Sequence, residues 1–127
     1  MATLERAIEI AASAHAGQCD KGGTPYILHP LRVMLQVTTK DERIAAVLHD
    51  VVEDTGVTLE LLKSEGFEQT VLDAVAALTK KPGESRLEAA ARARANPIAR
   101  AVKLADNADN MDFERIGALS DKDVARL

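Results

Sequence analysis

Apolar residues recur at helical spacing along almost the whole chain, and glycine or proline interrupts them at short intervals. In the first segment, Leu4, Ala7, Ile8 and Ala11 share one face of a predicted helix over 2–16, which Gly17 ends. Similar segments predict helices over 31–37, 42–53, 58–66, 68–78, 84–95 and 97–111. No alternating pattern typical of strands stands out. The sequence therefore predicts an all-α bundle of about seven to eight helices.

Composition limits the size and the kind of core. With 127 residues, 46% of them hydrophobic, the chain suits one compact domain over 1–127. Only 2% of the residues are aromatic, so the core must rely on alanine, leucine, valine and isoleucine. A further helix start near Ser120 comes shortly before Leu127, which predicts a terminal helix that the chain cuts short.

Several classes of partner and compartment are disfavoured. The formal net charge of -4 argues against a general nucleic-acid surface. Cys19 is the one cysteine, so neither an internal disulfide nor a thiolate zinc cage is expected. No signal peptide and no run of about 18 apolar residues is recognisable. We expect a cytoplasmic protein with no membrane partner, and a homo-oligomer stays open.

The segment 48–55 carries a histidine and three carboxylates where the preceding residues predict a buried helix, with Asp41 as a plausible N-cap. At about 100° per residue, His49 and Glu53 lie on one face, as do Asp50 and Asp54. Burying such charges without partners would cost several kcal/mol. A divalent metal is the simplest positive partner.

Two more residues can complete a metal site with His49 and Asp50. His29 precedes Pro30 at a predicted helix start, and Asp106 interrupts an apolar helix. Imidazoles and carboxylates without thiolates favour Mn²⁺, Fe²⁺ or Mg²⁺ over structural zinc. Waters in the remaining positions would leave the site open for catalysis. The alternative for His49 and Asp50 alone is a polar pair at a helix end.

Four motifs occur in one order over about residues 5–112: AHAGQ (14–18), KGGTPYILHP (21–30), LHDVVEDT (48–55), and VKLAD (102–106) followed by Asn110-Met111. This order resembles the HD phosphohydrolase superfamily, and within it the (p)ppGpp hydrolase domain of RelA/SpoT proteins and small alarmone hydrolases. The resemblance implies an all-α fold, one Mn²⁺ ion and removal of the 3′-pyrophosphate from guanosine tetra- or pentaphosphate. It also implies that His29, His49, Asp50 and Asp106 are the metal ligands.

The same resemblance assigns Glu53 and Asp54 to orienting the attacking water and assisting proton transfer. A carboxylate one turn beyond the ligands suits that chemistry. The alternative for both residues is a solvated helix end.

The predicted substrate contacts come from three segments of the chain. Asn110 matches a family nucleotide contact, and we expect Tyr26 to line the same pocket. Lys21 and Lys103 are the best candidates to counter phosphate charge. The alternative is an ordinary loop lysine at Lys21 and outward helix positions at Lys103 and Asn110.

One departure from the family bears on the base. The usual Arg-Lys pair of the first loop, whose arginine packs on guanine, is Asp20-Lys21 here. A carboxylate removes that contact and repels polyphosphate unless it points away. Adenosine alarmones therefore stay open, as do another HD-type nucleotide phosphatase or phosphodiesterase and a non-catalytic metal-dependent nucleotide sensor. The segment 23–26 and the Glu53-Asp54 pair favour the alarmone branch.

Overall fold

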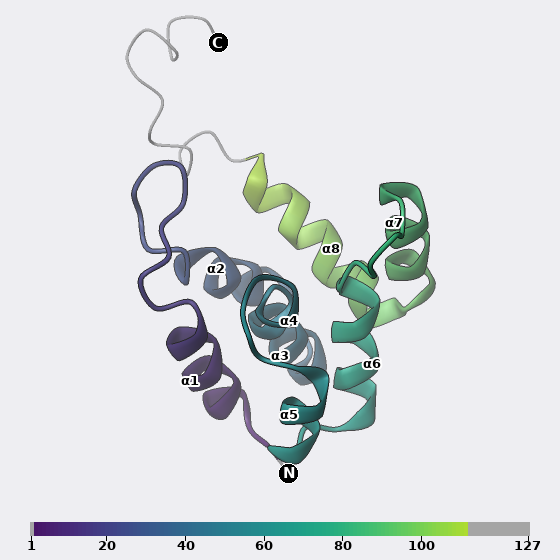
Figure 1. The fold of residues 1–127 in the computed structure, drawn as a ribbon, viewed down its shortest axis with the longest axis horizontal. Helices are drawn as coiled ribbons and strands as arrows, with labels where there is room; N and C mark the ends of the chain where they lie inside the picture. The colour runs from purple at the N-terminus through teal and green to yellow at the C-terminus, as the bar shows by residue number, and fades with distance from the viewer. Residues whose placement is uncertain (1, 112–127) are drawn as a thin grey trace, which may run out of the picture.

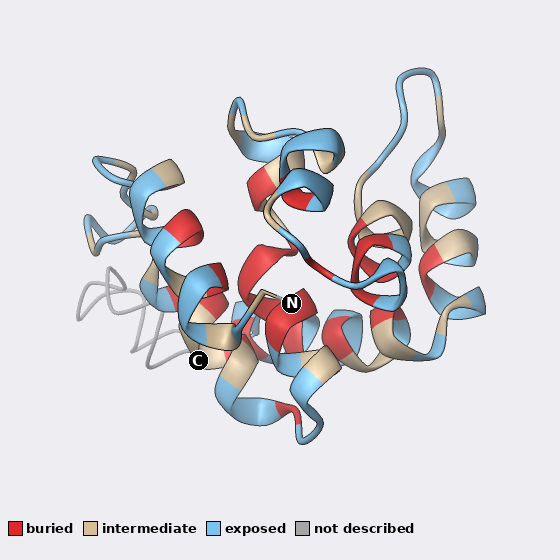
Figure 2. Ribbon diagram, turned by 90° about the horizontal axis from the view of Figure 1, so that it is seen from below, coloured by how far each residue is buried: buried red, intermediate tan, exposed pale blue. Residues whose placement is uncertain are grey.

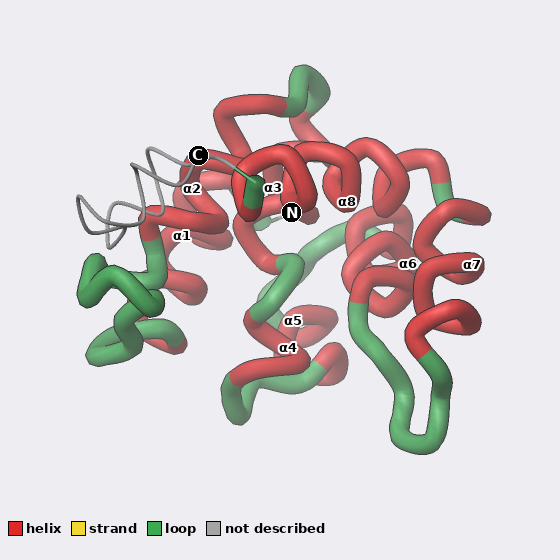
Figure 3. The backbone as a smooth tube through the Cα atoms, turned by 90° about the horizontal axis from the view of Figure 1, so that it is seen from above, coloured by secondary structure: helices red, strands yellow, loops and turns green. Residues whose placement is uncertain are grey.

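The computed structural model describes residues 2–111 and contains eight helices over that range (Figure 1). They are α1 (Leu4–Ala14), α2 (Leu28–Gln36), α3 (Lys40–Leu48), α4 (Val51–Asp54), α5 (Leu59–Ser64), α6 (Gln69–Leu78), α7 (Arg86–Ala95) and α8 (Pro97–Asn110). Helices and loops make up the described part of the chain (Figure 3), with one isolated antiparallel bridge between Cys19 and Pro25. The predicted all-α fold is confirmed. The helix predicted after Ser120 lies outside the described residues.

Side-chain caps explain where several helices begin. Thr3, Thr58 and Asn96 each accept a hydrogen bond from a backbone N–H of the first turn that follows. The predicted cap at Asp41 is wrong, because α3 begins earlier. The Thr39 side chain accepts the N–H of Glu42, whose carboxylate accepts the N–H of Thr39 in return. This capping box satisfies donors that a helix start otherwise leaves unpaired.

The predicted single helix over 42–53 is divided in two. α3 ends at Leu48, and α4 begins at Val51. Between them the N–H of His49 bonds to the carbonyl of Ala46, three residues back, at 3.4 Å. The His49 ring also donates to that carbonyl, so the last turn tightens and the α-helical pattern stops. The break lies at the His49-Asp50 pair itself.

The predicted start of α2 is also wrong, by three residues. The helix begins at Leu28, so His29 lies inside its first turn and not before it. Pro30 follows within that turn, where a missing N–H costs nothing because the first N–H groups have no helical partner. His29 therefore projects from a rigid helix.

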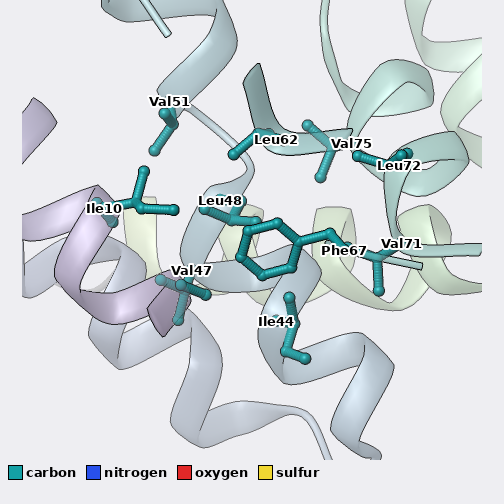
Figure 4. Close-up of a cluster of buried hydrophobic side chains, with 12 residues drawn as sticks. Ile10, Ile44, Val47, Leu48, Val51, Leu62, Phe67, Val71, Leu72 and Val75 are labelled. Atoms are coloured by element: carbon teal, nitrogen blue, oxygen red, sulfur yellow. The ribbon is translucent and has the colours of Figure 1, made fainter. Parts of the chain in front are cut away.

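Helix α3 is the centre of the fold and packs against α1, α2, α6 and α8. One core cluster, drawn in Figure 4, joins α3 to α1, α4, α5 and α6 through aliphatic side chains such as Leu48 and Val75, with Phe67 adding an aromatic ring. A second joins α3 to α2, α6 and α8 around Ala45, Ala46 and Val102. Buried positions gather on the inward faces of the helices (Figure 2). The small alanines of α3 permit close helix approach, which brings α2 and α8 together beside its C-terminal end.

No helix in the described range is long and apolar enough to cross a membrane.

Candidate metal centre

Two buried histidines face each other where α2, α3 and α8 meet. His29 comes from the first turn of α2, and His49 follows the last residue of α3. Their ring centroids are 5.3 Å apart in an edge-on arrangement. Because α2 and α3 pack directly against each other, the rigid helices fix the relative position of the two rings.

The hydrogen bonds of the rings select one tautomer for both histidines. Nδ1 of His29 donates to Oδ2 of Asp109 at 2.5 Å, and Nδ1 of His49 donates to the carbonyl of Ala46 at 2.6 Å. With Nδ1 bonded in this way, Nε2 is the atom of each ring that is left to bind a metal, which would replace any proton there. Metal-binding histidines in proteins are held in this way.

Two carboxylates meet these Nε2 atoms. Oδ1 of Asp106 lies 2.7 Å from Nε2 of His29 and 3.3 Å from Nε2 of His49. Oδ2 of Asp50 lies 3.0 Å from Nε2 of His49 and 4.0 Å from Nε2 of His29. One ligand atom each from His29, His49 and Asp50 fall within 4.8 Å of one another. The structure therefore brings all four predicted ligands together.

Hydrogen bonds between the histidines and the carboxylates of the cluster shift the pKa values of both kinds of group. Burial by itself would raise the pKa of Asp106, but hydrogen bonds with His29 and His49 outweigh it and hold that pKa far below its usual range. Burial would lower the pKa of His49, yet hydrogen bonds with Asp106 and Asp50 raise it to about 10. Two imidazoles and two carboxylates form a donor set that suits a divalent ion such as Mn²⁺, Fe²⁺ or Mg²⁺.

Tyr26 has a contact that the sequence did not predict. Its hydroxyl donates a hydrogen bond to Oδ2 of Asp50, and burial together with the charge of Asp50 raises the pKa of the phenol well above its usual value. The ring lies 5.6 Å from that of His29, centroid to centroid. Tyr26 therefore lines the site and also orients one of its carboxylates.

The predicted substrate residues divide between two cavities. Lys21, Tyr26 and Asn110 line a cavity of about 550 Å³ together with His29. Lys103 instead lines a second cavity of about 320 Å³, between α6, α7 and α8, which it shares with Glu53. The two cavities adjoin the same centre, since Nζ of Lys103 lies 3.6 Å from Oδ2 of Asp106 and Nδ2 of Asn110 lies 3.4 Å from Oδ1.

Asp20, the unusual residue of the first loop, takes part in the structure of that loop. Its Oδ1 accepts hydrogen bonds from the N–H groups of Gly22 and Thr24, at 2.9 and 3.0 Å. This carboxylate oxygen is thus turned toward the loop backbone, although Asp20 still lines the larger cavity.

Glu53 and Asp54 both lie on the short helix α4 and are exposed. Partial burial of the Asp54 carboxyl raises its pKa, and the charges of Asp50 and Glu53 raise it further. A carboxylate with a raised pKa is a better proton acceptor. The sequence predicted that His49 and Glu53 share one face of a continuous helix. The break at His49-Asp50 interrupts that helix between the two residues.

Two residues of the centre escaped the sequence reasoning. Asp109 is 2% exposed and bonds to His29, and Arg32 bonds to Asp109. A signal for them exists, because Asp109 follows Asp106 by three positions on α8, and Arg32 follows His29 by three positions on α2. Each pair shares a helix face.

Comparison with known proteins identifies the architecture. The family model of the HD domain matches residues 7–109, most of the chain. The chain belongs to the HD-domain family. An HD domain implies a divalent metal, and the buried cluster of this HD domain offers the donors for one.

The HD domain also resembles proteins of guanosine tetraphosphate metabolism. It is 35% identical to a probable GTP pyrophosphokinase of Mycobacterium leprae, over 87% of this chain and 16% of that protein. It is 42% identical to a guanosine-3′,5′-bis(diphosphate) 3′-pyrophosphohydrolase of Aquifex aeolicus, over 61% of this chain and 12% of that protein. The chain thus spans less than a fifth of the length of these curated relatives. A solved structure of a metazoan ortholog of SpoT that hydrolyzes ppGpp superposes with a TM-score of 0.71 and 29% identity, covering 87% of this chain and 68% of that one.

Proposed function

We propose that this HD domain is a metal-dependent hydrolase that removes the 3′-pyrophosphate from guanosine tetra- or pentaphosphate, or from a related alarmone. The observation that carries the proposal is the convergence of two imidazole Nε2 atoms and two carboxylates, with both Nδ1 atoms bonded elsewhere. Relatives named ppGpp 3′-pyrophosphohydrolase and the SpoT ortholog support the substrate.

His29, His49, Asp50 and Asp106 would hold the ion, and among the divalent ions that this donor set suits we propose Mn²⁺, which the resemblance to (p)ppGpp hydrolases implies. When bound, such an ion supplies Lewis acidity toward a phosphoryl oxygen and lowers the pKa of water. Tyr26 keeps Asp50 oriented through its hydrogen bond.

The surrounding residues divide the remaining tasks. Asp54, with its raised pKa, accepts the proton of the attacking water, and Glu53 orients that water. Lys21 and Asn110 contact the nucleotide in the larger cavity, and Lys103 counters phosphate charge from the smaller one. Attack at the 3′-linked phosphorus releases pyrophosphate and leaves a nucleoside 5′-diphosphate or 5′-triphosphate, with no covalent intermediate.

The test is product analysis after incubation of Mn²⁺-loaded protein with ppGpp and, separately, with its adenosine counterpart. We expect pyrophosphate and the nucleoside 5′-diphosphate, and the ratio of the two rates measures how Asp20 affects base choice. Asp106→Ala should abolish metal binding and turnover. Asp54→Asn, which removes the proton acceptor, should keep the metal and lose about 100-fold or more in rate.

The rival functions predict different results. A non-catalytic nucleotide sensor would bind Mn²⁺ and nucleotide but form no product from either compound. Another HD-type phosphatase or phosphodiesterase would release orthophosphate, or cleave a phosphodiester, and would leave the 3′-pyrophosphate intact. Either pattern would contradict the proposal.

A further inference from the structure

A buried ion pair lies directly behind one of the metal-binding histidines. The Asp109 side chain is 1% exposed, and its Oδ2 accepts the Nδ1–H of His29 at 2.5 Å. Arg32 donates to the same carboxylate twice, from Nε to Oδ1 at 2.8 Å and from an Nη to Oδ2 at 3.2 Å. Neither Asp109 nor Arg32 was predicted to act in the site.

The four side chains alternate in charge across the interface of two helices. His29 and Arg32 share one face of α2, and Asp106 and Asp109 share one face of α8. His29 thus lies between two carboxylates, Asp106 at Nε2 and Asp109 at Nδ1. The carboxylate at Nε2 belongs to the metal cluster, whereas the one at Nδ1 faces away from it.

We infer that Asp109, itself held by Arg32, is a positioning residue that keeps the proton of His29 on Nδ1 and so directs the Nε2 lone pair at the metal. The inference rests on the metal site of the proposed function. A carboxylate acceptor also makes the imidazole a stronger ligand.

Arg32 has a separate task in this arrangement. A buried carboxylate without a partner is costly, and the bidentate guanidinium compensates its charge, while Oδ2 also accepts the Nδ1–H of His29. His49 differs, because its Nδ1–H donates to the neutral carbonyl of Ala46. The two histidines of the site are therefore unequal ligands, and His29 is the one tuned by charge.

The first experiment measures Mn²⁺ affinity by calorimetric titration of the metal-free protein and of Asp109→Asn. We expect about 10- to 100-fold weaker binding in the variant. Glu84→Gln is the matched control, since Glu84 also pairs with an arginine, Arg92, at 2.6 Å, but contacts neither histidine of the site. It should bind Mn²⁺ as the wild type does, even though it loses a carboxylate–arginine pair.

The second experiment observes the tautomer directly, and its first measurement uses only the wild-type protein. In wild-type protein with ¹⁵N-labelled histidine and diamagnetic Zn²⁺ bound, we expect a slowly exchanging proton coupled to Nδ1 of His29. In Asp109→Asn that signal should shift or broaden, while the Nδ1–H of His49 stays unchanged. A merely structural role for Asp109 would not move one histidine signal selectively.

The outcomes separate this inference from the function on which it rests. If the wild type binds neither Mn²⁺ nor Zn²⁺, the metal site and this inference fail together. If the wild type binds metal but the proton lies on Nε2 of His29, or if Asp109→Asn binds Mn²⁺ within about twofold of wild type, the positioning role alone is overturned.

Discussion

Truncating Leu48 to alanine should test the central place of α3 in the fold. Leu48 is 0% exposed, belongs to the core cluster that α3 shares with α1, α5 and α6, and lies one residue before the His49-Asp50 pair. The carbon atoms that alanine lacks are worth about 2 kcal/mol in transfer free energy, at about 0.8 kcal/mol for each methylene. Because the surrounding helices relax only in part, the cavity raises the expected loss of unfolding free energy to about 3–4 kcal/mol.

The assay is urea unfolding of the metal-free protein, followed by far-ultraviolet circular dichroism. Removing metal with a chelator matters, because a bound ion would add its own binding free energy to the measured stability. A loss of this size corresponds to a fall in Tm of roughly 12–16 °C for a domain of this length. The denaturant slope should stay unchanged, since the variant alters native packing and not the surface exposed on unfolding.

Leu87→Ala is the matched control, the same chemical change on α7 at a side chain that is 82% exposed. We expect it to change the free energy of unfolding by no more than about 0.5 kcal/mol. If Leu48→Ala cost less than about 1 kcal/mol, or no more than Leu87→Ala, the packing of the core around α3 would be refuted.

Three further predictions follow from the site and its surroundings. Tyr26→Phe removes the donor to Asp50 and should weaken Mn²⁺ binding about tenfold in calorimetric titration; unchanged affinity would mean that Tyr26 only lines the cavity. Lys103→Met should raise KM for ppGpp about tenfold with a smaller change in kcat, and an unaltered KM would remove Lys103 from substrate binding. Arg92 lowers the pKa of Glu84 to about 2, so this carboxylate stabilises the fold above its ordinary pKa of 4.5, and the effect is lost as pH falls toward 2. In Glu84→Gln, the free energy of unfolding should fall less than in the wild type as the pH falls from 4.5 toward 2. The same fall in both proteins would contradict the pairing of Glu84 with Arg92.

Most helix positions could be predicted because their signals are local. The helix starts predicted at Thr58 and Pro97 fall within one residue of those in the structure, since a cap or an N-terminal proline acts on the turn that follows it. The sequence failed at α3, where two plausible caps compete. Only the reciprocal bonds between Thr39 and Glu42 decide against Asp41. The break at His49 escaped prediction because a side chain competes there for a backbone carbonyl.

The sequence by itself determined the all-α class and the residue types of the candidate metal centre, because helical periodicity and the adjacency of His49 and Asp50 are visible along the chain. Only the tertiary structure decided which groups meet. His29 contacts Asp106 and Asp109 across 77 and 80 positions of sequence, a separation over which no local pattern carries information. The packing of α2, α3 and α8 closes that distance, and burial then requires each charged group in the interface to find a partner.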